Sequence, residues 1–130
     1  MKKLLLIFIL FFPIASYAQN ILVAKNKNGL FYIDIANIKE NNGNVYYWVT
    51  LDFLKPAKSP AGRIMSVKLL LELNCKTPKK ERVLTSNSYD RPMAKGELLL
   101  SDNGSKDWKY HTPDSTGASV MEYVCNLTTK

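Results

Sequence analysis

The sequence predicts an α+β fold, in which a β-sheet of about six strands carries a single C-terminal helix on one face. Three observations lead to this prediction. Apolar and polar residues alternate along several segments before residue 103, as they do in strands with one buried face. Near the C-terminus the apolar residues recur at helical spacing instead. Finally, two cysteines fall on the apolar sides of one strand and of the helix, where a disulfide would tie these elements together.

The N-terminal segment, residues 1–18, has the pattern of a secretory signal peptide. A short basic start (MKK) precedes the apolar run LLLIFILFFPI, and the small residues Ser16 and Ala18 occupy the −3 and −1 positions. We expect cleavage after Ala18 to leave a mature domain, residues 19–130, in the periplasm, on the cell surface or secreted. The alternative is an uncleaved membrane anchor, but a spanning helix needs about 20 apolar residues. No cysteine lies near the cut, which argues against a lipid-anchored lipoprotein.

The mature chain is expected to be moderately basic. The full sequence has 18 basic and 11 acidic residues, so removal of the two leader lysines leaves 16 against 11 and a net charge of about +5. This charge favours mild attraction to anionic surfaces such as lipopolysaccharide, heparin-like glycans or acidic proteins. An exported chain is not expected to bind nucleic acid.

The mature chain begins with two short strands, predicted at residues 21–26 and 30–34 and joined by a turn at KNG. Asp34 then starts the segment DIANI, which predicts a single helical turn with Asp34 as its cap. The segment ENNGN at 40–44 is expected to form a tight turn into the next strand.

That next strand, NVYYWVTLDF at 44–53, has large apolar side chains on both faces. The core face is expected to hold Val45, Tyr47, Val49, Leu51 and Phe53. Tyr46 and Trp48 point the other way, where a half-buried sheet usually presents polar residues to water. We expect them, with Leu70, to form a contact surface for a second copy or another protein. Cross-strand packing alone is the alternative explanation.

The following segments complete the predicted sheet. Residues 54–62 contain two prolines and a glycine and are expected to form a loop. A long strand at 63–75 places on one face Val67, Leu69, Leu71, Leu73 and Cys75. After the basic turn KTPKK, a fifth strand is predicted at 81–89 and a sixth at 96–102.

The C-terminal segment predicts a helix capped by Asp114 or Ser115. One side of this helix is expected to carry Gly117, Val120, Met121, Val124, Cys125 and Thr128. A helix of about ten residues is marginal in isolation, so something else must hold it. Two cysteines in an oxidising compartment favour one disulfide, Cys75–Cys125, which would pin the helix to the core face.

No motif in the sequence predicts catalysis, a metal site or a cofactor. The single histidine, His111, lies in a predicted loop and is expected to be solvated. The chain contains no GxSxG, HExxH or glycine-rich phosphate loop. The cysteines are too far apart for a CxxC redox pair or a zinc site. The sequence therefore predicts a binding or structural protein rather than an enzyme.

Two further features suggest contacts. The segment CKTPKKER concentrates four basic residues, Lys76, Lys79, Lys80 and Arg82. We expect either a solvated turn that protects a sheet edge or a patch for an anionic partner. Trp108 is expected to fill the junction between sheet and helix, and a contact surface is the alternative.

The order of segments along the whole mature chain resembles the surface-adhesin protein E family. The resemblance covers roughly residues 21–126, including both cysteines, and is carried by GLFYIDIANI, NGNVYYWV, LDFLKP, SVKLLLELNC, the Gly-Glu pair at 96–97, DW, PDS and the final VC. It implies a curved antiparallel sheet of about six strands with a disulfide-tied C-terminal helix, and dimerisation. The chain lacks the lipoprotein cysteine of the namesake adhesin, and it has Asp114 where many members have glycine.

The resemblance also implies a function. We expect an exported binding protein that acts as an adhesin for host extracellular-matrix or plasma proteins. The alternative is a periplasmic envelope or inhibitor protein with no host ligand. The expected partners are a host protein, a second copy of the chain or an anionic glycan, and the mature chain is expected to have no transmembrane segment.

Overall fold

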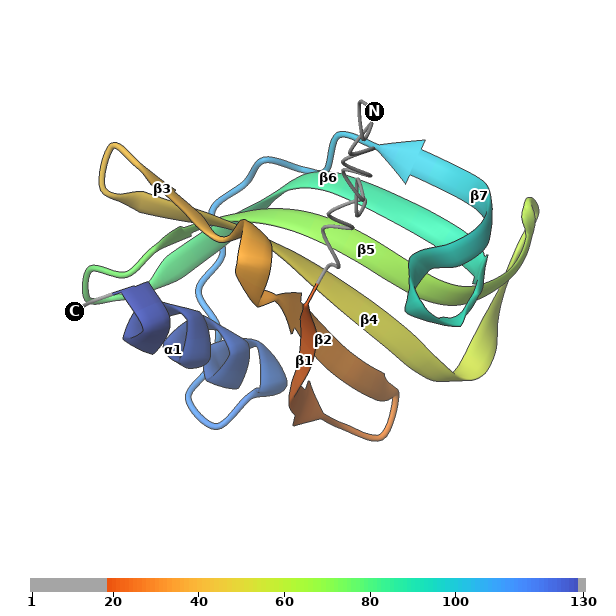
Figure 1. Ribbon diagram of the computed structural model, residues 1–130, viewed down its shortest axis with the longest axis horizontal. Coiled ribbons are helices and arrows are strands. Elements are labelled where there is room, and N and C mark those ends of the chain that lie inside the picture. The colour runs from red at the N-terminus through yellow and green to blue at the C-terminus, as the bar shows by residue number, and fades with distance from the viewer. Residues whose placement is uncertain (1–18, 129–130) are drawn as a thin grey trace, which may run out of the picture.

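Seven antiparallel strands and a C-terminal helix make up the computed structural model over residues 19–128, the part of the chain that it describes (Figure 1). The predicted signal peptide lies outside these residues. The strands are β1 (Asn20–Lys25), β2 (Gly29–Asp34), β3 (Lys39–Asn41), β4 (Asn44–Ser59), β5 (Gly62–Asn74), β6 (Lys80–Arg91) and β7 (Lys95–Asp102). The helix is α1 (Thr116–Thr128), and the short 3₁₀ turns are η1 (Ile35–Asn37) and η2 (Pro92–Ala94). The predicted fold class is confirmed.

The strands follow one another through the sheet in the order β1-β2-β4-β5-β6-β7, and β3 pairs with the start of β4. Asp34 caps η1 as predicted, because its Oδ1 accepts a hydrogen bond from the Ala36 N–H at 3.2 Å. The tight turn between β3 and β4 uses Asn42 and Gly43, both with positive φ, as a two-residue hairpin requires. This turn was predicted from the sequence, but β3, whose three residues are all exposed, was not.

The predicted loop at 54–62 is wrong, because β4 continues to Ser59 and β5 begins at Gly62. The register between these strands shifts between Asp52 and Ala57, so several residues of β4 bulge out around Pro56. A proline cannot donate to a strand ladder, but it is tolerated at such a bulge. Pro56 therefore interrupts the pairing without ending the strand, and Pro60 lies in the turn between β4 and β5.

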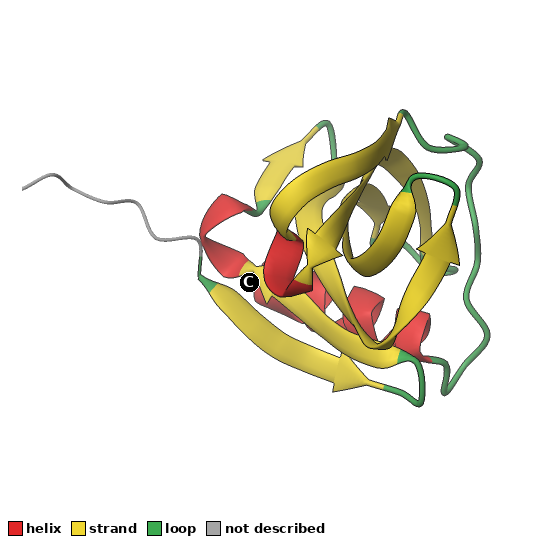
Figure 2. Cartoon of the chain, turned by 90° about the vertical axis from the view of Figure 1, so that its right-hand side faces the viewer, coloured by secondary structure: helices red, strands yellow, loops and turns green. Residues whose placement is uncertain are grey.

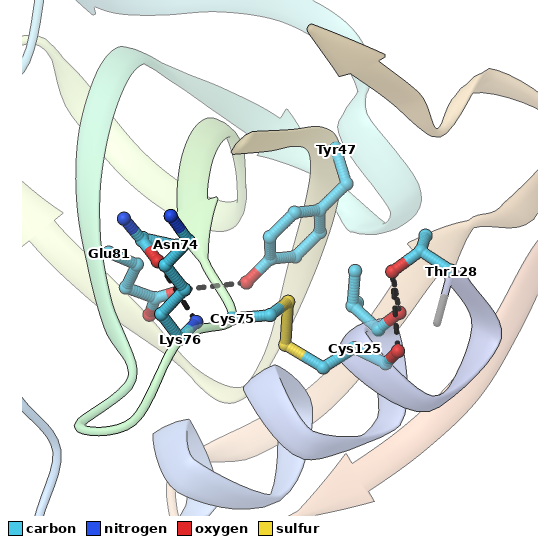
Figure 3. Close-up of a disulfide and its surroundings, with 8 residues drawn as sticks. Tyr47, Asn74, Cys75, Lys76, Glu81, Cys125 and Thr128 are labelled. Atoms are coloured by element: carbon cyan, nitrogen blue, oxygen red, sulfur yellow. Dashed lines mark hydrogen bonds between the residues drawn. A yellow bond between two sulfur atoms is a disulfide. The ribbon is translucent and has the colours of Figure 1, made fainter. Parts of the chain in front are cut away.

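One face of the sheet, called here the core face, packs against α1 (Figures 1 and 2). The buried apolar residues are Ile33, Val45, Tyr47, Val49, Leu71, Leu73, Val120, Met121, Val124 and Cys125. Ser115 caps the helix, since its Oγ accepts a hydrogen bond from the Ala118 N–H at 3.1 Å. The predicted disulfide joins Cys75 to Cys125 across this core (Figure 3).

Within residues 19–128, the opposite side of the sheet, called here the outer face, is covered at one end by η2. There η2 packs on β4 and β5. Ser66 donates to the Arg91 carbonyl at 2.6 Å and accepts from the Ala94 N–H at 2.9 Å. Ser66 is consequently buried, although it belongs to the outer face, and Thr50 on the same face is buried as well. In the described part of the chain, α1 thus covers the core face and η2 covers one end of the outer face, while the outer face around Tyr46, Trp48 and Leu70 lines a hollow.

Candidate functional site

The open end of the outer face carries the aromatic residues that the sequence analysis singled out. Trp48 and Leu70 lie opposite each other in the β4–β5 register, and Tyr46 lies two residues along β4. These three half-buried side chains, called here the outer patch, line a hollow of about 390 Å³. The rest of the lining comes from the β3 region and consists of Asn37, Lys39 and Asn41. The structure therefore brings the predicted contact residues together.

The outer patch lies in a cationic setting. The Lys68 Nζ atom lies 5.0 Å from the centroid of the Trp48 ring, within the range of a cation–π contact. Lys39 is exposed at the side of the hollow. This setting favours a partner with acidic groups around an apolar contact.

Hydrogen bonds to Glu72 hold one end of the outer patch in place. The Tyr46 hydroxyl donates to Glu72 Oε2 at 3.1 Å, and the Asn44 amide donates to the same oxygen at 3.0 Å. The Arg82 guanidinium forms an ion pair with Oε1 at 2.7 Å. Burial raises the pKa of the Glu72 carboxyl, but the bonds from Arg82, Asn44 and Tyr46 outweigh it and keep the pKa below its ordinary value. Burial and then the bond to Glu72 raise the pKa of Tyr46. Glu72 therefore remains ionised near neutral pH and fixes the Tyr46 ring.

The predicted basic cluster is divided by the structure. Lys80 and Arg82 both lie over the Trp108 ring, at 4.8 and 4.6 Å from its centroid, and Arg82 is also paired with Glu72. Lys76 is exposed and Lys79 half-buried in the turn before β6. Arg82 is therefore less available to bind an anion than the three lysines, because Glu72 already neutralises its charge.

The prediction that Trp108 fills the sheet–helix junction is wrong. Its neighbour Lys109 forms an isolated bridge with Glu81, which faces the core. Because successive side chains in an extended segment alternate, Trp108 lies on the outer face with Arg82. It extends the aromatic and cationic surface there.

A buried polar network on the core face was missed by the sequence analysis. The Tyr47 hydroxyl donates to Glu81 Oε2 at 2.6 Å (Figure 3), and His111 Nε2 lies 2.6 Å from Glu81 Oε1. Burial and the nearby Glu81 charge raise the pKa of Tyr47 well above its ordinary value. The prediction that His111 is solvated is therefore wrong, because its ring is bonded to Glu81 and its side chain is only 30 % exposed. The signal was the shared parity of Glu81 and Val83, which places Glu81 on the core face.

The His111 ring also lies against the first turn of α1. A Cβ atom added at Gly117 would lie 2.4 Å from His111 Nδ1, which is too close for any real side chain. Glycine at this helical position thus permits the close approach of the imidazole. Together the hydrogen bond between His111 and Glu81 and this contact fix the loop before α1 to the sheet.

Neither a metal site nor a membrane span is found in residues 19–128. Within this range, no group of three or more His, Cys, Asp or Glu side chains is placed to hold a metal ion. None of the helices in this range combines the length and the apolar character that a membrane span requires.

The chain was compared with known proteins. The model of the family described as "Surface-adhesin protein E" matches residues 20–126. Among solved structures, Haemophilus influenzae protein E is 22 % identical, with a TM-score of 0.68 over 88 % of this chain and 89 % of that one. Its crystal form II gives 22 % identity and a TM-score of 0.71 over 91 % and 95 % of the two chains. No curated protein matches the chain.

The solved structures share the fold described above, and their identity to this chain is too low to carry more than the fold. The family model, by contrast, matches most of the chain and includes both cysteines of the disulfide. The chain belongs to the surface-adhesin protein E family.

Proposed function

We propose that this adhesin-like protein is exported and binds host extracellular-matrix or plasma proteins through the outer patch. The observation that carries the proposal is the group formed by Tyr46, Trp48 and Leu70 on an open part of the sheet. Large aromatic side chains at the centre of a contact contribute most of the binding energy in many protein interfaces. Family membership supports a protein partner.

The charges around the outer patch support a partner with acidic side chains. Lys68 lies over Trp48, and Lys39 stands at the border of the hollow. Long-range attraction between a basic surface and an acidic partner speeds association and weakens as salt rises. The Glu72 bonds hold Tyr46 before any partner arrives, which reduces the ordering cost of binding.

The direct test measures binding of the purified protein to immobilised matrix and plasma proteins. Trp48→Ala should weaken binding by roughly 2 kcal/mol or more, the effect expected of an interface hot spot. Tyr110→Ala is the matched control, because Tyr110 is an exposed aromatic residue outside the outer patch. Equal binding by the parent and by folded Trp48→Ala would contradict the assignment of the patch.

Two further measurements distinguish the other expected partners. Light scattering would show whether Trp48→Ala dissociates a homodimer, which would assign the outer patch to a second copy of the chain. Loss of heparin retention in a variant with Lys76, Lys79, Lys80 and Arg82 all changed to Ser would assign an anionic glycan to the basic turn. Unchanged retention would leave the turn as a solvated feature.

The alternative function is a periplasmic envelope or inhibitor protein without a host ligand. An adhesin must be reachable from outside the cell, whereas a periplasmic protein is not. Labelling of intact cells with a membrane-impermeant reagent separates the two. The proposed signal peptide is tested separately by determining the N-terminus of the exported protein, which should be Gln19.

A further inference from the structure

An apolar cleft opens on the core face of the sheet beside the first turn of α1. Its volume is about 220 Å³. Its apolar walls are contributed by β2, β4, β5, β6 and α1 and consist of Phe31, Val49, Leu69, Leu71, Val83 and Val120. The outer patch lies on the opposite face of the sheet, since Trp48 and Val49 are consecutive in β4. The cleft is therefore separate from the surface proposed for the protein partner.

The polar residues of the cleft are neighbours of one another. Glu81, Lys109 and His111 lie together in the lining, where Lys109 and Glu81 are joined by backbone hydrogen bonds of 2.8 and 3.0 Å. The two Glu81 oxygens are occupied by Tyr47 and His111. Arg82 also contributes to the lining, but its guanidinium is paired on the outer face.

Lys109 is the cation that is left for a ligand. Its side chain lies on the same side of the sheet as Glu81, because the two residues face each other in an antiparallel bridge. Lys109 is exposed, and no ion pair to it is found in the part of the chain that the structure describes. The first turn of α1 also lines the cleft through Gly117, and the positive end of the helix dipole adds to the attraction for an anion.

The size of the cleft limits the ligand. Pockets for drug-sized ligands measure roughly 300–1,000 Å³, whereas an apolar cavity of about 150 Å³ holds benzene. A cleft of about 220 Å³ lies between these sizes and matches one short chain. The apolar walls require an apolar body, and the Lys109 ammonium favours a negatively charged head group.

We propose that this cleft binds a small amphiphilic carboxylate, with a medium-length aliphatic chain between the sheet and α1 and the carboxylate at Lys109. Octanoate has this chemistry and is the probe for the test. Octan-1-ol and octylammonium have the same chain with a neutral and a positive head group. Comparison of the three separates the contribution of the chain from that of the charge.

Isothermal titration calorimetry of the purified protein with octanoate, below its micelle-forming concentration, should show saturable binding to one site. Octylammonium should bind more weakly than octanoate. Lys109→Gln should weaken octanoate binding by roughly two- to fivefold, as expected for an exposed ion pair, and leave octan-1-ol binding unchanged. Lys95→Gln is the matched control, because Lys95 is an exposed lysine on β7 outside the cleft lining.

Val83→Phe should abolish binding by filling the cleft, and circular dichroism would establish that the variant is folded. If it does not fold, amide NMR of the parent gives the same information. Octanoate should then shift the resonances of Val83, His111 and Val120 and leave those of Trp48 and Leu70 in place. Absence of saturable binding, undiminished binding in folded Val83→Phe, or equal affinity for octanoate and octylammonium would each overturn the proposal.

Discussion

Tyr47 and Trp48 are consecutive residues with opposite surroundings. Tyr47 is fully buried in the core and bonded to Glu81, whereas Trp48 is half-buried in the open outer patch. Of these two aromatic side chains, Tyr47 therefore stabilises the core, whereas Trp48 forms part of an accessible surface. Substitution at each position separates the two roles.

Tyr47→Ala should lower the free energy of unfolding by about 3–5 kcal/mol, because it leaves a cavity in the core and removes a partner of buried Glu81. Trp48→Ala should cost about 1 kcal/mol or less, the range of a cross-strand pair. Urea denaturation followed by fluorescence measures both. If Trp48→Ala unfolds the domain as readily as Tyr47→Ala, both faces are core and the outer patch is not a contact surface.

Glu72 makes stability depend on pH in the acid range. Its pKa is below the ordinary value in the folded protein, so the unfolded chain binds a proton more readily. The resulting stability is fully present above the unfolded pKa of about 4.3 and is lost as pH falls through the lower, folded pKa. Acid should therefore destabilise the domain partly through this residue.

Glu72→Gln should reduce stability at pH 7 by roughly 1–3 kcal/mol and have a smaller effect at pH 3. The upper part of this range is reduced by solvent screening, because the Arg82 side chain is 32 % exposed. Urea midpoints measured across this pH range provide the test. Glu97→Gln, at an exposed position of β7, is the control and should keep the acid destabilisation of the parent, because Glu72 is intact. Identical pH profiles for the parent and Glu72→Gln would contradict the proposed role of the bonds to Glu72.

At the scale of elements, α1 depends on contacts outside itself. It is capped by Ser115, joined by the disulfide to Cys75 directly after β5, and approached by His111 at Gly117. A helix of this length gains little from its own hydrogen bonds in water. Each of these attachments should therefore be measurable in the stability of the whole domain.

Gly117→Ala should destabilise the domain by about 1–3 kcal/mol, because the new methyl group meets the His111 ring. This sign is opposite to the gain of about 1 kcal/mol usual for this change inside a helix. In a His111→Ala background the same substitution should become neutral or stabilising. Thermal denaturation of the four proteins of this cycle gives the coupling directly. A stabilising Gly117→Ala in both backgrounds would show that the contact is not made in solution.

Cys125→Ser should lower stability by roughly 2–5 kcal/mol, since it opens a closed loop of 50 residues. Mass spectrometry of the non-reduced protein should show the mass expected for the chain less two hydrogen atoms. Reduction of the parent should lower its stability to a similar degree. A parent protein that titrates with thiol reagents before reduction would contradict the disulfide.

At the scale of the whole molecule, the alternation along β4 and β5 predicted the buried part of these strands. Leu51, Phe53 and Val67, which were predicted on the same face, are only half-buried and lie outside the core cluster. Val45, Leu71 and Leu73 occupy the expected face because a half-buried strand must separate its side chains by parity. The buried face of α1 was predictable in the same way, because its apolar residues recur at the helical spacing of three or four residues. Pro56 misled the analysis because proline marks a loop as readily as a bulge.

The rest of the site depends on contacts between segments that are distant in the sequence. His111 meets Glu81 across 30 residues, and η2 sets the limit of the outer patch by folding back onto β4 and β5. Local patterns do not specify such pairings. Trp108 could have been placed only by knowing that its neighbour Lys109 bridges Glu81.

The Cys75–Cys125 bond also has a mechanical consequence. A protein that links two bodies carries tension, and a stretched chain extends by at most about 3.3–3.6 Å per residue. The disulfide prevents the 50-residue segment between its cysteines from extending under tension, and the fully extended length of this segment is roughly 165–180 Å. A pull on the two ends would therefore lengthen only the segments outside the bond. In a single-molecule force measurement, reduction of the disulfide would add this length to the extension of the unfolded chain. The redox state of one bond would therefore set the maximum extension of the domain under force.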